Sequence, residues 1–209
     1  MLTYEQQKRI LDLIIVVILL IIFLPFWIIV PTLLVISDGF PILFSHKRMG
    51  KGGKEFYMKK FRSMIKNAHE ILHEQNSELL EKFKNSDWKF PANEDPRITS
   101  LGKVLRTLTI DEFPQLFNVL KGEMSMVGPR AYMKKELNEQ TKKYPKTKKY
   151  VKHILSIKPG ITGPWQTTGR NEIPFPQRAK IDAEYAQQKN IWNDIKIILK
   201  TPKAMISKW

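Results

Sequence analysis

The sequence predicts an α+β, mainly helical fold with an N-terminal re-entrant helix hairpin in a membrane, a small β-hairpin, and amphipathic helices at the membrane surface. Three observations lead to this prediction. Residues 13–36 carry no charge, a glycine-rich basic turn lies between two short apolar pieces, and much of the remaining chain has the apolar spacing of helices. With 209 residues, we expect an N-terminal membrane segment over 1–38 and one continuous domain over 39–209.

The apolar run is long enough to cross a membrane, but it is interrupted. Its 24 residues would reach about 36 Å as a straight helix, against about 30 Å of hydrocarbon. Pro25 removes the backbone hydrogen bond to the Ile21 carbonyl, and Pro31 does the same to Trp27, so we expect a kink. Basic residues flank both ends, which gives no preferred orientation: Lys8, Arg9, Lys47, Arg48, Lys51 and Lys54. We favour a re-entrant hairpin broken at Pro25 over a kinked single crossing or a buried helix of a soluble core.

The next segment, residues 40–62, predicts the β-hairpin, with its turn at Met49 to Lys54. This turn resembles a phosphate-binding loop only superficially, because Arg48 and Glu55 stand where the Walker pattern needs Gly and Ser or Thr. Residues 63–84 predict an exposed amphipathic helix broken near Asn76.

Later in the chain, helices are predicted over about 110–120, 131–153 and 176–189, and from about Trp192 onwards. A Pro/Gly-rich loop is expected over 158–176. The last helix combines an apolar face with lysines and Trp192, a composition that suits a membrane interface.

The composition narrows the classes of partner. A formal net charge of +15 indicates an anionic partner, with nucleic acid, anionic lipid and a phosphorylated substrate all open. The absence of cysteine excludes a disulfide scaffold, an iron–sulfur protein and a Cys-type zinc finger. The mean hydropathy of −0.30 is an average over the apolar run and a strongly basic remainder, and the run favours the membrane.

One segment, His69-Glu70-Ile71-Leu72-His73, fits the HExxH pattern of zinc peptidases. In that pattern, histidines one helical turn apart bind the metal and the glutamate activates water. Three fixed residues in five recur by chance, and no third ligand is evident, so we favour a solvated helix surface.

The adjacent pair Asp111-Glu112 opens an apolar helical stripe. Since Pro114 is tolerated only in the first turn of a helix, Asp111 is a candidate N-cap. Alternatively, the two carboxylates hold Mg²⁺ and one attacks a phosphoryl group, with Arg106 and Arg130 nearby to bind phosphate oxygens. Spacing alone leaves capping and catalysis equally open.

Two further features suit anions. The segments 127–130 and 158–166 combine glycine and proline with nearby arginines, and their backbone N–H groups could cradle an anion, although such loops are often only tight turns. A lysine run is usually a solvated face, but beside a membrane segment it also suits anionic headgroups: Lys134, Lys135, Lys142, Lys143, Lys146, Lys148, Lys149 and Lys152.

Four segments, in this order, carry a resemblance to a known family. They are KFRSM (60–64), DPRITSLGKVLRTLTIDEFPQLFNVLKGEMSMVGPR (95–130), KPGITGPWQTTGRN (158–171), and the tail with Asp182, Tyr185 and Asp194. From Lys8 to Thr201 the chain resembles the bacterial sugar transferases, the monotopic polyprenyl-phosphate phosphoglycosyl transferases. The resemblance implies a re-entrant helix broken at Pro25 and a catalytic domain on the cytoplasmic face of the bacterial inner membrane, with membrane lipids as partners.

The resemblance also implies a reaction. Asp111 would be the nucleophile and a Mg²⁺ contact, with Glu112 as its essential partner. The aspartate would attack the β-phosphate of a UDP-sugar and expel UMP, and undecaprenyl phosphate would then take the sugar phosphate from the enzyme. Six further residues match polar positions around the phosphates and the nucleotide: Lys60, Arg62, Arg106, Arg130, Arg170 and Asp182.

Three positions depart from the family pattern. Leu24-Pro25 replaces Ser-Pro, Ala131 replaces the second proline of Pro-Arg-Pro, and Pro164 replaces the leucine of Gly-Leu-Trp-Gln. The insertion between Met64 and Asp95 resembles that of hexose-transferring members, so we favour galactose or glucose phosphate and a role in polysaccharide or glycoconjugate synthesis.

Competing hypotheses are a membrane zinc peptidase that uses residues 69–73 and a non-enzymatic basic protein that binds lipid or nucleic acid. Since a membrane and a diphosphate account for the charge, we expect no nucleic-acid partner. The sequence leaves the sugar, the glycan pathway and the oligomeric state open, a homo-oligomer included.

Overall fold

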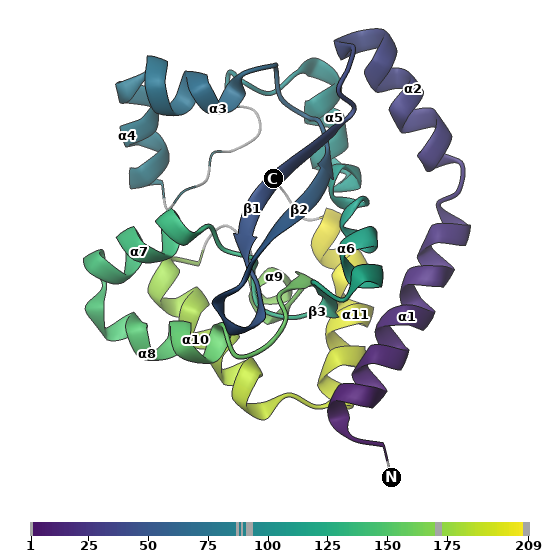
Figure 1. The fold of residues 1–209 in the computed structure, drawn as a ribbon, viewed down its shortest axis with the longest axis vertical. Coiled ribbons are helices and arrows are strands. Elements are labelled where there is room, and N and C mark those ends of the chain that lie inside the picture. The colour runs from purple at the N-terminus through teal and green to yellow at the C-terminus, as the bar shows by residue number, and fades with distance from the viewer. Residues whose placement is uncertain (1, 87, 89, 91–93, 170–172, 207–209) are drawn as a thin grey trace.

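The computed structural model describes residues 2–86, 88, 90, 94–169 and 173–206, and this part of the chain is mainly helical (Figure 1). The helices are α1 (Tyr4–Ile22), α2 (Phe26–Asp38), α3 (Ala68–Glu70), α4 (Ser77–Asn85), α5 (Ser100–Thr107), α6 (Gln115–Lys121), α7 (Lys134–Lys143), α8 (Lys148–Ile154), α9 (Pro164–Thr168), α10 (Phe175–Gln188) and α11 (Ile191–Ile206). The strands are β1 (Leu43–Met49), β2 (Glu55–Phe61), β3 (Ser125–Val127) and β4 (Gly160–Thr162).

The N-terminal helices α1 and α2 form a bent pair along one edge of the molecule (Figure 1). Pro25 is the N-cap of α2, and the two helix axes differ by 63°, so the break predicted at Pro25 is confirmed. The second helix continues through Pro31. In the described part of the chain, no helix alone has the length and hydropathy of a membrane span, but the bent pair together does.

The predicted β-hairpin is confirmed. Strands β1 and β2 pair antiparallel from Leu43 opposite Phe61 to Met49 opposite Glu55, and the 3₁₀ turn Lys51–Gly53 joins them. Gly52 and Gly53 have φ of 71° and 73°, a region that glycine enters at little cost. Lys60 is the second-last residue of β2.

The predicted helix over 63–84 is shorter than expected but is broken where expected. Met64 bridges to Ile98 as an isolated β-pair, and Asn67 adopts a left-handed conformation, so helix α3 starts only at Ala68. A π-helical segment, Ile71–Gln75, follows. Asn76 then caps α4 by accepting a hydrogen bond from the Leu79 N–H, which ends the first segment and begins the next.

The loop predicted over 158–176 is wrong, since it contains β4, α9 and the start of α10. Strands β3 and β4 pair in parallel, Ser125 with Gly160 and Val127 with Thr162. Glycine is required here because a Cβ on Gly128 would lie 2.5 Å from the Lys158 carbonyl oxygen. Gly128 therefore allows the backbone after β3 to approach the backbone before β4 closely.

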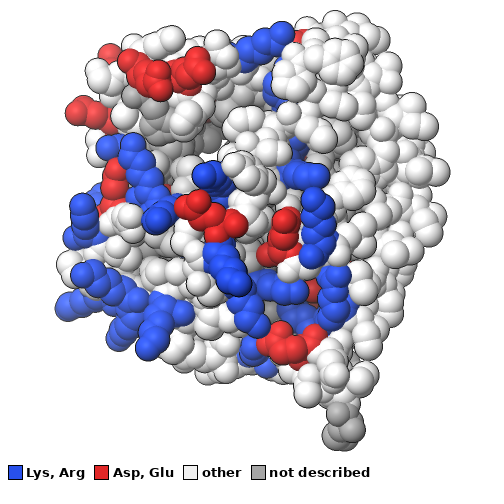
Figure 2. Space-filling view, viewed as in Figure 1, with Lys and Arg blue, Asp and Glu red and all other residues white. Residues whose placement is uncertain are grey.

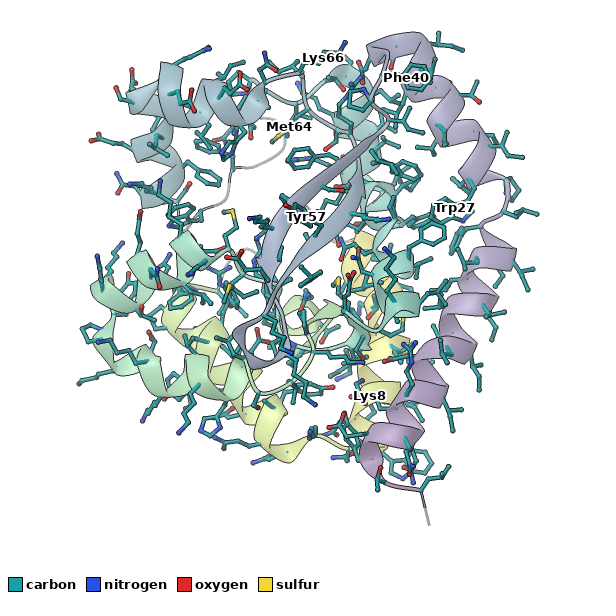
Figure 3. The ribbon with its side chains drawn as sticks, viewed as in Figure 1. Lys8, Trp27, Phe40, Tyr57, Met64 and Lys66 are labelled. Atoms are coloured by element: carbon teal, nitrogen blue, oxygen red, sulfur yellow. The ribbon has the colours of Figure 1, made fainter. Side chains whose placement is uncertain are left out.

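Contacts from α1 and contacts at the bend attach the helix pair to the rest of the protein. At the start of α1, Lys8 pairs with Asp194 on α11 at 2.9 Å, and Asp12 accepts hydrogen bonds from Ser125 Oγ and the Met126 N–H. At the bend the contacts are aromatic: the Phe23 and Phe113 rings are 4.8 Å apart, and Trp27 packs on Phe117 and Phe61. Figure 3 shows Lys8 and Trp27 on the side of the pair that faces the body of the protein.

The opposite face of the helix pair is apolar and exposed. Its exposed residues include Ile14, Val17, Ile18, Ile21, Leu24, Ile28, Ile29, Leu33 and Ile36. The corresponding edge of the molecule is almost free of charge in Figure 2. An exposed apolar surface of this kind marks contact with a membrane or another protein.

The lysine run lies elsewhere. Its residues are exposed on α7, α8 and the turn between them, and α8 packs on α10. Figures 1 and 2 show this basic region on the side of the molecule opposite α1 and α2. The run is therefore exposed and lies away from the helix pair in this view, and its contact with anionic headgroups stays a prediction.

Candidate active site

The Asp111-Glu112 pair lies in a short 3₁₀ turn between α5 and α6. Thr109 has a left-handed backbone with φ of 58°, and the turn Ile110–Glu112 follows it directly. Pro114 is the N-cap of α6. The interpretation of Asp111 as the N-cap of this helix is therefore wrong, because Asp111 lies within the separate turn and Pro114 occupies the N-cap position.

Lys60 on β2 holds the two carboxylates. Its Nζ donates a 2.6 Å hydrogen bond to Glu112 Oε1 and lies 3.5 Å from Asp111 Oδ2. Asp111 is only 3% exposed, whereas Glu112 is half-buried. The hairpin and the 3₁₀ turn therefore bring one lysine and two carboxylates together, although Lys60 and Glu112 are 52 residues apart in the sequence.

Burial and nearby charges act in opposite directions on the pKa of Asp111. Burial raises the pKa of its carboxyl, while the cations Lys60 and Arg106 act in the opposite direction. Arg106 on α5 is itself fixed by a 2.9 Å hydrogen bond from its Nε to Ser63 Oγ. Within the described residues, Asp111 Oδ1 is buried without a hydrogen-bond partner. Among the described residues, one oxygen of this carboxylate is therefore uncommitted.

A small polar pocket opens beside this pair. It brings together Lys60, Glu112 and Arg130 with residues that sequence reasoning did not single out as site residues. The full lining is Arg48, Met58, Lys60, Glu112, Gln115, Arg130, Ala131, Gly160, Ile161 and Gln166. Gln115 directly follows Pro114, and Gln166 belongs to the 158–166 segment. Arg48 was noted only as a basic residue that flanks the apolar run and departs from the Walker pattern, and not as a site residue.

Arg62 has a different environment from the one expected. Its Nη2 donates to the carbonyls of Asp38 and Gly39 at 2.5 and 2.6 Å, and it is not among the residues that line the pocket. These carbonyls belong to the last residue of α2 and the one after it, where a cation is favourable. Arg62 therefore connects the end of the helix pair to β2.

Arg130 lines the pocket, and the buried Asp182 lies beside it. The Arg130 guanidinium carbon is 5.7 Å from the centre of the Trp165 ring, and the Arg130 N–H donates to Asp182 Oδ2 at 3.1 Å. Asp182 on α10 is fully buried, and this burial raises the pKa of its carboxyl to about 7. Arg170, the remaining residue of the predicted set, lies outside the described residues.

The carboxylates fit a divalent cation only together with a phosphate ligand. In the described part of the chain, no group of three His, Asp or Glu residues could hold a metal by itself. Mg²⁺, however, usually needs only one or two protein carboxylates, with substrate phosphates and water completing its shell. The partnerless Asp111 Oδ1 and the neighbouring Glu112 match that need.

The HExxH segment does not form a comparable site. His69 and Glu70 lie in α3, and the chain then becomes π-helical from Ile71 to Gln75. A π-helix has more residues per turn, so the backbone does not keep the repeat that places positions four apart on one face of an α-helix. The segment therefore lacks the regular helix on which the zinc pattern depends.

Comparison with known proteins agrees with the sequence resemblance. The family described as bacterial sugar transferase matches residues 3–208. The chain belongs to this family. The match includes the helix pair as well as the Asp111-Glu112 pair and the pocket, so all of these are parts of one bacterial sugar transferase chain.

Several relatives of this sugar transferase have named activities. An undecaprenyl-phosphate galactose phosphotransferase of Salmonella typhimurium is 40% identical over 178 residues, which are 83% of this chain and 35% of that protein. The exopolysaccharide production protein ExoY of Sinorhizobium fredii is 36% identical over 202 residues, 95% of this chain and 85% of ExoY. A UDP-glucose:undecaprenyl-phosphate glucose-1-phosphate transferase of Xanthomonas campestris is 35% identical over 173 residues, 79% of this chain and 31% of that protein.

The relatives differ in length. The chain spans about a third of the galactose and glucose phosphotransferases (35% and 31%) but most of ExoY (85%). The part that this chain shares with the longer relatives is therefore about a third of their length.

Proposed function

We propose that this bacterial sugar transferase moves a sugar-1-phosphate from a UDP-sugar to undecaprenyl phosphate and releases UMP. The observation that carries the proposal is the buried Asp111 beside Glu112 and Lys60, at a pocket that also contains Arg48 and Arg130. A carboxylate with an uncommitted oxygen can act as a nucleophile, and arginines can neutralise the phosphates that would otherwise repel it.

In the first step, a carboxylate oxygen of Asp111 attacks the β-phosphorus of the donor. A bond forms between that oxygen and the phosphorus, the bond from phosphorus to the bridging oxygen breaks, and UMP leaves with the electron pair. In the second step, an oxygen of undecaprenyl phosphate attacks the same phosphorus, and the carboxylate leaves unchanged. Splitting the transfer in this way lets a water-soluble donor and a lipid acceptor use one site in turn.

The other residues of the site act on charge and position. Lys60 contacts both carboxylates and offsets the repulsion between Asp111 and Glu112. Arg106, whose side chain is fixed by Ser63, adds positive charge near Asp111. Arg130, which lines the pocket with Lys60 and Glu112, is suited to bind a phosphate oxygen of the donor. When bound, Mg²⁺ would be held by Asp111 and Glu112 and would neutralise the negative charge of the diphosphate.

The helix pair supports a re-entrant arrangement in which both ends lie on one side of the membrane. Its exposed face is apolar around the bend, whereas the start of α1 is held by Lys8, Arg9 and Asp12 and the end of α2 by Arg62. A membrane segment with a polar attachment at each end and an apolar bend fits entry and exit through the same surface. We place that surface at the cytoplasmic face of the bacterial inner membrane.

Galactose and glucose remain the favoured sugars, because the relatives that are 40% and 35% identical are named for them. Exopolysaccharide or another surface glycan is then the expected product.

The test is a panel of UDP-sugars incubated with the detergent-solubilised full chain, Mg²⁺ and undecaprenyl phosphate, with UMP release as the readout. A donor labelled in its β-phosphate, supplied without acceptor, should leave label on the protein, and undecaprenyl phosphate should remove it. The absence of UMP from every donor would contradict the proposed reaction. UMP release without labelled protein would contradict the covalent step alone.

A further inference from the structure

Two charged residues of α10 are more deeply buried than any charged residue of the pocket. Arg178 and Asp182 lie one helical turn apart, and both are 0% exposed. In the described part of the chain, Arg178 Nε, Nη1 and Nη2 have no hydrogen-bond partner, nor does Asp182 Oδ1. Burying a charge without full compensation is costly. A structure that retains both charges in this position needs a reason for them.

Their contacts lead to Arg130. The Arg178 guanidinium carbon is 5.5 Å from the centre of the Trp165 ring, and the Arg130 guanidinium carbon is 5.7 Å from the same ring. Two arginines are thus within cation–π range of one indole. Trp165 is itself 4% exposed, so its ring cannot move without displacing both guanidinium groups.

Asp182 reaches the same residue by another route. Its Oδ2 accepts a 3.1 Å hydrogen bond from the Arg130 backbone N–H. The amide therefore fixes the backbone from which the Arg130 side chain extends, while the Trp165 ring fixes the guanidinium at the other end. Of these four residues, Arg130 is the one that lines the pocket with Lys60 and Glu112.

We infer that Arg178 and Asp182 are positioning residues, which fix Arg130 for the donor diphosphate through the Trp165 ring and the Arg130 amide. The inference rests on the proposed function in one respect, namely that Arg130 binds a phosphate of the donor. It changes the role expected for Asp182, because a side chain with no exposed surface holds a substrate-binding residue and does not bind the substrate itself. It also adds Arg178, which the sequence did not indicate.

A double-mutant cycle on UMP affinity tests the inference, measured by calorimetry on the detergent-solubilised full chain. Arg178→Met should weaken UMP binding about tenfold, and Arg130→Met should weaken it at least as much. The double variant should bind UMP no more weakly than Arg130→Met alone, because residues that act through one another have non-additive effects. Additive losses would overturn the inference, since a residue that only stabilises the fold, or binds UMP by itself, acts independently of Arg130.

Conservative variants distinguish a specific loss of UMP binding from a loss caused by misfolding. Arg178→Lys keeps the charge beside the ring and should recover part of the affinity lost in Arg178→Met. Asp182→Asn keeps an acceptor for the Arg130 amide, so it should lose less affinity than Asp182→Ala. Equal losses within either pair would contradict the inference. Lys180→Met is the matched control, because it removes a positive charge from an exposed position of the same helix.

A turnover assay distinguishes failure of the proposed reaction from failure of the positioning role of Arg178 and Asp182. If the wild-type chain releases no UMP from any UDP-sugar, the proposed reaction fails, and the cycle still decides on binding alone whether Arg178 acts through Arg130. If the wild-type chain is active and the cycle is additive, the reaction stands and the positioning role fails. In an active enzyme, Arg178→Met should raise KM for the donor more than it lowers kcat, because the dyad is untouched.

Discussion

Two clusters of buried charge in this protein differ in how completely their polar atoms are paired. The foot cluster, made of Tyr4, Lys8, Tyr185 and Asp194, joins the start of α1 to α10 and α11. Asp194 Oδ2 accepts from Tyr4 and Lys8 at 3.0 and 2.9 Å, and Oδ1 accepts from Tyr185 at 2.5 Å. Among the described residues, none of these side-chain atoms is buried without a partner.

The site cluster, made of Asp111, Arg130, Arg178 and Asp182, is the opposite case. Each of its members has at least one buried side-chain atom without a hydrogen-bond partner in the described part of the chain. Native proteins leave few such atoms, and those that remain mark strain or a missing ligand. The contrast indicates that the foot cluster stabilises the fold. In the site cluster, Arg178 and Asp182 have no exposed surface and hold Arg130 as proposed, so the unpaired atoms that a substrate would engage are those of Asp111 and Arg130.

The largest expected effect comes from the site cluster. Asp111→Asn should lower UMP release by at least about 10³-fold, because it removes the nucleophile. It should not lower the melting temperature, since burial already disfavours the charged form of Asp111. Glu78→Gln, an exposed change on α4, is the control for loss of an acid. An active Asp111→Asn variant would contradict the assignment of the nucleophile.

The foot cluster should show the reverse pattern. Asp194→Ala leaves Lys8 buried without its acid, and breaking a buried pair in this way costs about 3–5 kcal/mol of stability. The melting temperature in detergent should fall, while the remaining folded protein keeps its KM. The control is Glu5→Ala, which breaks an exposed pair with Lys189 and should cost under about 1 kcal/mol. Equal shifts for the two variants would show that the foot cluster has no special role in stability.

A smaller effect should depend on pH. The Asp182 carboxyl has its pKa raised by burial from 3.8 to about 7, so the folded state binds its proton more tightly than the unfolded state. Its contribution to stability is therefore complete below pH 3.8 and is lost as the pH rises through about 7. Asp182→Asn removes this dependence. The melting temperature of the variant relative to wild type should rise with pH up to neutrality and then level off, and a constant difference would contradict the raised pKa.

The smallest effect is expected outside both clusters. His69→Ala should leave UMP release unchanged, and the wild-type chain should contain no stoichiometric zinc by elemental analysis. Loss of activity together with bound zinc would revive the peptidase hypothesis.

Local features of the fold could be predicted from the sequence. A proline removes a specific backbone hydrogen bond wherever it stands, so the break at Pro25 followed from one residue. The hairpin turn at Met49 to Lys54 followed from its glycines, since two of them adopt positive φ. The break at Asn76 followed from a side chain that caps helices well.

Features that depend on distant contacts could not be predicted in the same way. Strands β3 and β4 have three residues each, too few to show the alternation of apolar and polar residues that marks a strand. They also pair although they are far apart in the sequence. The Asp111-Glu112 pair was visible, but its turn was not, because a left-handed Thr109 has no sequence signal. Arg178 was missed because its proposed role depends on the Trp165 ring of α9, which it shares with Arg130 from the segment after β3.

The aromatic contact at the bend joins the helix pair to the turn that carries the two carboxylates. Phe113 follows Glu112 in the chain, and its ring lies 4.8 Å from Phe23 at the point where α1 gives way to α2. Membrane helices respond to bilayer thickness by tilting, and a tilt of this pair would press on the residue next to the carboxylates. If the pair enters the membrane as proposed, lipid chain length would adjust the active site without changing a single residue. UMP release in nanodiscs of graded thickness would measure how strongly the two are coupled.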